Sequence, residues 1–200
     1  PGSGPIFHAA FFSDIHGDKN NLKQLLNLPS AKMSDQWFDL GDLSLQCTMS
    51  GMSMLHNGLE IYAEQANGSI PLTFLRGNHD QYGHRAPDFL QLCGSTEGLT
   101  YSAFRSGPVL FISLDIGIDC KRTDDEIHEN CRMRDEQRQW LLKLQQTPLW
   151  RDATFRIVLS HITAYDQKYG SLEFIRMLEG VFNETDEKRL HALLGGHLHT

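Results

Sequence analysis

The chain lacks three features that would each indicate a broad class of protein. No hydrophobic run reaches the about 18 residues that a membrane-spanning helix needs. The four cysteines, Cys47, Cys93, Cys120 and Cys131, include no C-x-x-C pair, which argues against a zinc ribbon or a thioredoxin-type site. Lys and Arg number 18 against 25 Asp and Glu, so a chain-wide basic footprint for nucleic acid is missing. We therefore expect no membrane span and no nucleic-acid partner.

Internal repeats, low-complexity stretches and an initiator Met are also missing. The first five residues, Pro-Gly-Ser-Gly-Pro, are no signal peptide, and we interpret residues 1–5 as a linker or a cloning remnant. The remaining residues, 6–200, are long enough for one domain with a sizeable core, since 40% of the chain is hydrophobic and 22% is charged. This balance excludes a disordered chain and a small disulfide-stapled protein.

What the sequence does contain is an alternation of apolar runs and helical patterns. We predict strands at residues 6–12, 37–40, 71–75, 99–104, 109–114, 155–159 and 191–194. We predict helices at residues 20–28, 52–66, 133–146 and 185–190. The alternation indicates an α/β fold with a largely parallel core, to which the pair 99–104 and 109–114 adds a hairpin. We interpret the polar segment 117–132 as a surface insertion that governs substrate choice.

Ten histidines are the unusual feature of the composition, and several of them follow predicted strands. The segments after five strands read S-D-I-H-G, G-D, R-G-N-H-D, S-H and G-G-H-L-H. A single histidine at a strand end is usually a structural residue, but the carboxyl ends of parallel strands meet at one edge, so five such clusters indicate a shared site. Seven of these side chains are candidate metal ligands: Asp14, His16, Asp42, Asn78, His161, His197 and His199.

The types of these ligands indicate which metals the site would bind. Carboxylate oxygens, imidazole nitrogens and one amide oxygen suit Mn, Fe, Zn or Ni. Seven ligands are too many for one ion, but with one shared carboxylate they can hold two divalent or trivalent ions. Two ions roughly 3.5–4 Å apart can clamp the attacking and leaving oxygens of a phosphate ester. The sequence therefore predicts a dinuclear site with a phosphate-ester substrate.

The order of the clusters resembles the calcineurin-like metallophosphoesterase superfamily, whose motifs read D-x-H, G-D, G-N-H-[DE], H and G-H-x-H. The resemblance spans nearly the whole chain and implies a four-layer α/β/β/α sandwich. Family members usually continue beyond the last motif, which leaves open that this chain, ending at Thr200, lacks C-terminal strands. The resemblance implies two ligand sets and a bridge: Asp14, His16 and His199 on the first metal, Asn78, His161 and His197 on the second, and Asp42 between them.

The resemblance also implies roles in catalysis. A metal-bridging hydroxide would attack phosphorus in line, while His79 would protonate the leaving group as a general acid, oriented by Asp80. Arg76 matches an arginine that contacts phosphate in protein Ser/Thr phosphatases. The residues after the third and fourth motifs are candidates for the substrate rim: Tyr82, His84 and Tyr165.

Other features narrow the resemblance within the superfamily. Many members place Asp, Asn or Tyr three residues after the second-motif Asp, where this chain has Leu45. Because His16 is present, the chain is not a typical purple acid phosphatase, although residues 113–115 and 137–141 are similar to a bacterial purple-acid-phosphatase-like branch. The motif Gly-Asp-x-Val-Asp-Arg-Gly of protein Ser/Thr phosphatases is missing, so a phosphoprotein substrate is not supported.

Three functions fit these motifs. A phosphomonoesterase is the simplest interpretation, and a phosphodiesterase that acts on nucleotides or lipid headgroups is the alternative within the same chemistry. A non-catalytic binding module on this fold is a third, although such modules usually lose ligands that this chain retains. A bridge between Cys120 and Cys131 would fit an exported or periplasmic protein. The sequence leaves the oligomeric state open.

Overall fold

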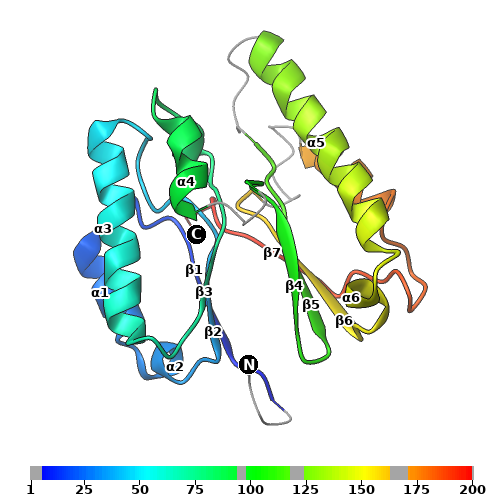
Figure 1. Cartoon of the computed structure of the whole chain (residues 1–200), viewed down its shortest axis with the longest axis horizontal. Coiled ribbons are helices and arrows are strands. Elements are labelled where there is room, and N and C mark those ends of the chain that lie inside the picture. Colours follow the sequence, from blue (N-terminus) through cyan, green and yellow to red (C-terminus); the bar gives the residue numbers. More distant parts are fainter. Residues whose placement is uncertain (1–5, 94–97, 118–123, 163–170, 200) are drawn as a thin grey trace.

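The computed structural model describes residues 6–93, 98–117, 124–162 and 171–199. These residues form two sheets (Figure 1). The first sheet is parallel throughout, in the order β1 (Ala9–Phe12), β2 (Gln36–Asp39) and β3 (Leu72–Phe74). The second has the order β4 (Ser102–Ser106), β5 (Val109–Ser113), β6 (Phe155–Leu159) and β7 (Ala192–Leu194). In the second sheet only the β4–β5 pair is antiparallel, so the predicted hairpin and the largely parallel core are both confirmed.

Helices cover the outer face of each sheet (Figure 1). Those of the first half of the chain lie on the side of the first sheet: α1 (Lys19–Leu26), α2 (Pro29–Lys32), α3 (Met49–Ala66) and α4 (Phe89–Cys93). Those of the second half lie on the side of the second sheet: α5 (Asp124–Leu144), α6 (Pro148–Arg151) and α7 (Ser171–Glu179). Two short 3-10 helices, η1 (His79–Gln81) and η2 (Ala86–Asp88), follow β3.

Three separate apolar clusters show that the fold has four layers. On β2, Trp37 packs with the helices of the first sheet, whereas its neighbour Phe38 packs against the second sheet. On β5, Phe111 joins that middle cluster, while Leu110 and Ile112 pack with the helices of the second sheet. Successive side chains of a strand point to opposite faces, so each sheet is buried on both sides. The predicted α/β/β/α sandwich is confirmed.

Two predictions about the second half of the chain were wrong. Residues 185–190 form no helix, because Asn183 Oδ1 accepts hydrogen bonds from the backbone N–H of Thr185 (3.0 Å) and from its hydroxyl, a local turn that competes with helix formation. The helix predicted at residues 133–146 begins earlier, at Asp124, within the segment interpreted as a surface insertion. Arg132 pairs there with Glu129 and Glu136, and such pairs stabilise an exposed helix that has little apolar periodicity.

Several predictions concern residues outside the described ranges: the linker 1–5, Cys120, Tyr165 and Thr200. The domain bounds therefore stay a prediction. Cys131 is an exposed free thiol, and the proposed compartment stays a prediction as well. Among the described helices, none combines the length and the apolar character that crossing a bilayer would require.

Candidate metal centre

The segments that follow β1, β2, β3, β6 and β7 meet at the carboxyl ends of the two sheets. Within the first sheet, the backbone N–H groups of Asp14 and His16 donate to the carbonyls of Gly41 (3.0 Å) and Asp42 (2.9 Å). Within the second sheet, the N–H of Gly196 donates to the carbonyl of His161 (2.9 Å). The predicted convergence of the motifs is therefore built into the backbone.

The backbone of most candidate ligands is left-handed. Six non-glycine residues of the described chain have positive φ, and five of them are candidate ligands: Asp14, His16, Asp42, His197 and His199, with φ between 49° and 75°. The sixth, Asn67, ends α3. Non-glycine residues avoid this conformation, so the surrounding loops must impose it, and such strain is typical of functional sites.

Two glycines bring these loops into close contact. A Cβ atom at Gly77 would lie 2.1 Å from Oδ1 of Asp42, and one at Gly196 would lie 1.7 Å from Oγ of Ser13 and 2.7 Å from Oδ2 of Asp14. No other residue fits at either place without displacing a candidate ligand. The glycines of the third and fifth motifs therefore allow the loops to approach the two carboxylates.

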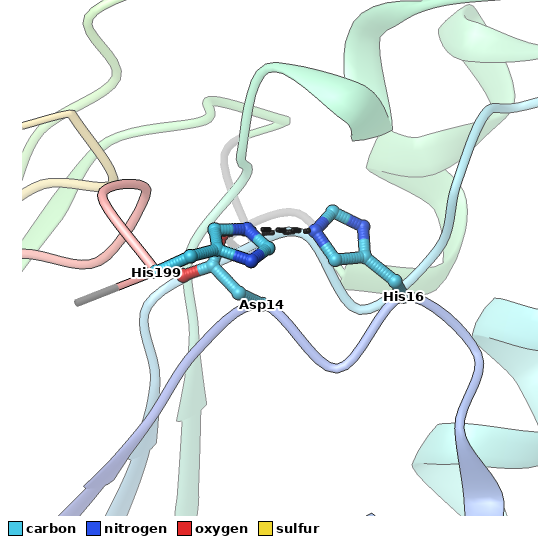
Figure 2. Close-up of side chains that lie close together, drawn as sticks. All are labelled: Asp14, His16 and His199. Carbon is cyan, nitrogen blue, oxygen red and sulfur yellow. Dashed lines mark hydrogen bonds and ion pairs between the residues drawn. The ribbon is translucent and has the colours of Figure 1, made fainter.

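The first cluster, which we call the outer cluster, consists of Asp14, His16 and His199 (Figure 2). Oδ1 of Asp14 lies 3.1 Å from Nε2 of His199 and 3.8 Å from Nε2 of His16. The two Nε2 atoms are 3.2 Å apart. Two imidazole nitrogens and a carboxylate oxygen thus face one point, an arrangement that suits a cation.

The second cluster, which we call the inner cluster, consists of Asp42, His161 and His197. Nδ1 of His161 donates to the carbonyl of Leu40 (2.9 Å), so Nε2 carries the lone pair and lies 3.0 Å from Oδ2 of Asp42. Asp42 also belongs to a third group with His16 and His79. Asp42 is therefore within reach of both clusters, where a bridging ligand would have to be.

Unpaired buried atoms test whether these residues suit a metal. Asp14 Oδ1, Asn78 Oδ1 and His161 Nε2 are buried and have no hydrogen-bond partner in the described part of the chain. A buried acceptor without a partner is unfavourable, and such atoms usually indicate water or an ion. Seven buried side-chain atoms of the described residues lack a partner, and four of them, these three and Nδ1 of His16, belong to candidate ligands, whereas the others lie on Ser113, Arg134 and Arg156. The concentration of unpaired atoms at the candidate ligands fits divalent cations.

The charges of the site follow from its hydrogen bonds. Burial raises the pKa of Asp14, but hydrogen bonds from the Ser13 hydroxyl and the His197 N–H, with the nearby imidazoles, lower it overall below its usual value. Burial lowers the pKa of His161, but the Asp42 carboxylate more than compensates and raises it overall. Asp14 therefore stays ionised, as a ligand of a cation must.

Asp80 is fully buried and ties two loops together. Its Oδ2 accepts from the N–H groups of Asp42 (2.8 Å) and Gly77 (3.0 Å), and its Oδ1 accepts from the Ser44 hydroxyl (3.0 Å). Burial and the charge of Asp42 raise the pKa of Asp80. The carboxylate thus fixes the second and third motifs relative to each other.

His79 lies beside the inner cluster and is held by two hydrogen bonds. Its N–H donates to Oδ1 of Asp42 (2.8 Å), and its Nδ1 donates to the carbonyl of Leu45 (2.8 Å). Its ring centroid is 4.9 Å from that of His16. The ring contact expected from Asp80 comes instead from Leu45, a backbone partner that residue types along a sequence do not reveal.

The candidate rim residues are not all at the surface. Tyr82 is buried with its ring centroid 5.6 Å from that of His79, and His84 is exposed. The Arg76 guanidinium pairs with Asp115, a buried carboxylate that the sequence reasoning did not include in the site. A signal for Asp115 was present, because it follows a strand as the other clusters do.

Comparisons with known proteins agree with this geometry. A family model described as calcineurin-like phosphoesterase matches residues 7–200. A dimetal phosphatase from Danio rerio is similar in structure, with a TM-score of 0.63 and 12% identity over 96% of this chain and 88% of that one. A search of curated proteins found no match.

Two longer proteins share the fold. A purple acid phosphatase from yellow lupin (Lupinus luteus) seeds has a TM-score of 0.58 and 15% identity, and the alignment covers 100% of this chain and 39% of that one. PhoD has a TM-score of 0.56 and 14% identity over 96% of this chain and 51% of that one. The resemblance inferred from the motifs is thus confirmed: with a family model that matches almost its whole length, the chain belongs to the calcineurin-like phosphoesterase family.

Proposed function

We propose that the chain hydrolyses phosphate esters at a site for two metal ions and that phosphate monoesters are its preferred substrates. The observation that carries the proposal is the set of buried ligand atoms without a hydrogen-bond partner, on Asp14, Asn78 and His161, at the point where both sheets end. Family membership supplies the class of reaction, and the unpaired atoms support a place for cations within it.

The ligand assignment follows the two clusters. Asp14, His16 and His199 would hold one ion, Asn78, His161 and His197 the other, and Asp42 both. The ions would be Mn, Fe, Zn or Ni, in a divalent or trivalent state. When bound, they would supply positive charge for the phosphate and activate water for attack on phosphorus.

His79 is proposed as the general acid. Because Nδ1 donates to the carbonyl of Leu45, Nε2 is the ring atom that remains for proton exchange with a leaving-group oxygen. The hydrogen bond from its N–H to Asp42 keeps His79 beside the carboxylate shared by both clusters. Asp80 supports this arrangement through the loops rather than through the ring. Arg76, Tyr82, His84 and Tyr165 stay predictions for substrate binding.

The test combines metal analysis with substrate comparison. The purified chain would be loaded with each candidate metal, the bound ions counted by elemental analysis, and kcat/KM measured for nitrophenyl phosphate and for bis-nitrophenyl phosphate. We expect two ions per chain and the higher kcat/KM on the monoester. A higher value on the diester would support a phosphodiesterase. Two bound ions without hydrolysis of either ester would support a binding module.

A further inference from the structure

The candidate ligands come from two separate sheets, so their distances depend on how the sheet edges are held. Asp14, Asp42 and Asn78 follow strands of the first sheet, whereas His161 and His197 follow strands of the second. A metal site tolerates only small errors in ligand position. Polar contacts that connect the two sheet edges at this end of the molecule would therefore control the distances between the ligands.

A buried ion pair forms one such link. Arg76 follows β3 of the first sheet, and Asp115 follows β5 of the second. Nε of Arg76 donates to Oδ2 of Asp115 at 2.7 Å, and Nη2 lies 2.5 Å from the same oxygen. The Asp115 side chain is fully buried and that of Arg76 is 16% exposed. Two donors on one oxygen restrict the guanidinium far more than a single contact does.

Asp115 is itself fixed from three directions. Its Oδ1 accepts from the N–H of Gly117 (2.9 Å). The Gln137 side chain on α5 accepts from the N–H of Asp115 (2.8 Å) and donates to its carbonyl (2.6 Å). The backbone of Asp115 is thus tied to the helix that covers the second sheet and its carboxylate to the Gly117 N–H, so Asp115 offers Arg76 a rigid partner.

On the side of the first sheet, Arg76 is adjacent in sequence to the candidate ligands. Arg76 precedes Gly77 and Asn78, and Gly77 lies so close to Asp42 that even a Cβ atom would collide with its carboxylate. A displacement of Arg76 would therefore move Asn78 or press on Asp42. The hydrogen bond from His161 to the Leu40 carbonyl (2.9 Å) is a second connection between the sheets in the same region.

We propose that Arg76 and Asp115 form a positioning pair that sets the distance between the two sheet edges and so preorganises the metal site. The inference rests on the proposed function. It gives Arg76 a role different from the phosphate contact expected from its motif, because its Nε and Nη2 atoms are engaged with Asp115. Ion pairs of this kind act through ligand geometry, as the outer partners of metal ligands do.

The main test uses the double variant R76M/D115N. It removes both charges together, because a buried pair replaced as a whole leaves no uncompensated charge. The amide oxygen that D115N introduces can still accept from the N–H of Gly117. Metal affinity would be measured by titration of the metal-free chain, and folding by its melting temperature. We expect a folded chain whose metal affinity is lower by about ten- to one-hundred-fold.

The matched control is D152N, which breaks the exposed pair between Arg105 and Asp152 (3.6 Å) at the opposite end of the second sheet. We expect its metal affinity to equal that of the wild type. R76K is the second variant, since it keeps the charge but has no fork of donors, and we expect a smaller loss of metal affinity than in the double variant. If the double variant fails to fold, R76K decides the test.

The outcomes separate the possible roles. Unchanged metal affinity in a folded R76M/D115N, or in R76K, would overturn the inference. A raised KM that persists at saturating metal, with normal metal affinity, would make Arg76 a substrate ligand instead. A wild-type chain that binds fewer than two ions would contradict the proposed function itself, whereas equal binding of two ions by wild type and variants would contradict the positioning role alone.

Discussion

The outer and inner clusters hold similar ligands at very different depths. In the inner cluster, Asp42 and His161 are each only 1% exposed. In the outer cluster, the side chain of His199 is 56% exposed and that of His16 is 19% exposed. A buried ligand set is fixed by packing on all sides, whereas exposed ligands depend on their own loops. We therefore expect the inner ion to be held tightly and the outer ion to exchange more readily.

Asp42 provides the strongest test of the two-cluster arrangement, because it reaches both clusters. Asp42→Asn removes the charge shared by the two sites, so we expect both ions to be lost. The expected fall in kcat/KM exceeds about 10⁴-fold, more than the loss of a general acid alone would cause. Elemental analysis and nitrophenyl phosphate assays would measure it. A variant that keeps two ions would show that Asp42 is not a shared ligand.

A substitution of His79 tests the proposed general acid separately from metal binding, because His79 is not a candidate ligand. We expect His79→Asn to retain both ions and to slow alkyl phosphates by about 10²- to 10⁴-fold, because a strongly basic alkoxide needs a proton on departure. Nitrophenyl phosphate, with its good leaving group, should be slowed far less. The measurement is kcat/KM on both esters with metal content determined in parallel. Equal losses on the two esters would argue against proton donation.

His199 and His161 provide the direct comparison of depth. We expect His199→Asn to lower the affinity of the outer ion by about tenfold, with activity recovered at higher metal concentration. His161→Asn should lose the inner ion without such recovery, because its side chain is enclosed between the two sheets. Metal-dependent activity curves for the two variants would show the difference. Identical curves would remove the distinction between the clusters.

Asp39 is fully buried, and its carboxyl interacts electrostatically with His161 of the inner cluster, so it tests the buried side of the site through pH. Burial raises its pKa from 3.8 to about 8, against the hydrogen bonds from Gly41 and Tyr62. The fold therefore favours the protonated form of Asp39. The contribution of protonated Asp39 to the free energy of unfolding is complete below about pH 4 and is lost as the pH rises to about 8.

In the metal-free chain, ionisation of Asp39 lowers the free energy of unfolding by at most about 1.4 kcal/mol for each pH unit in this range. Asp39→Asn keeps an acceptor for the Gly41 N–H but cannot ionise, so we expect a flatter profile. Denaturant unfolding at several pH values would measure it, with Asp152→Asn as the exposed control. A profile as steep as that of the wild type would assign the slope to other groups.

Sequence reasoning located the candidate ligands because their positions depend on local order: each follows a strand, and strand ends meet. It did not predict the partners that come from distant segments of the chain. The carbonyl of Leu45 and the carboxylate of Asp115 become part of the site only through tertiary packing. Helix α7 was missed although Phe174, Met177 and Leu178 lie on one buried face, a spacing that does predict a helix.

The sequence separation within the outer cluster has a consequence for folding. His16 and His199, 3.2 Å apart, are 183 residues apart along the chain. Contacts that close such long loops form late, after the intervening strands have paired, since their entropy cost is met only by earlier contacts. A ribosome-bound chain therefore cannot complete this cluster until residue 199 has emerged. Acquisition of the outer ion would therefore report that the two ends of this long segment have come together.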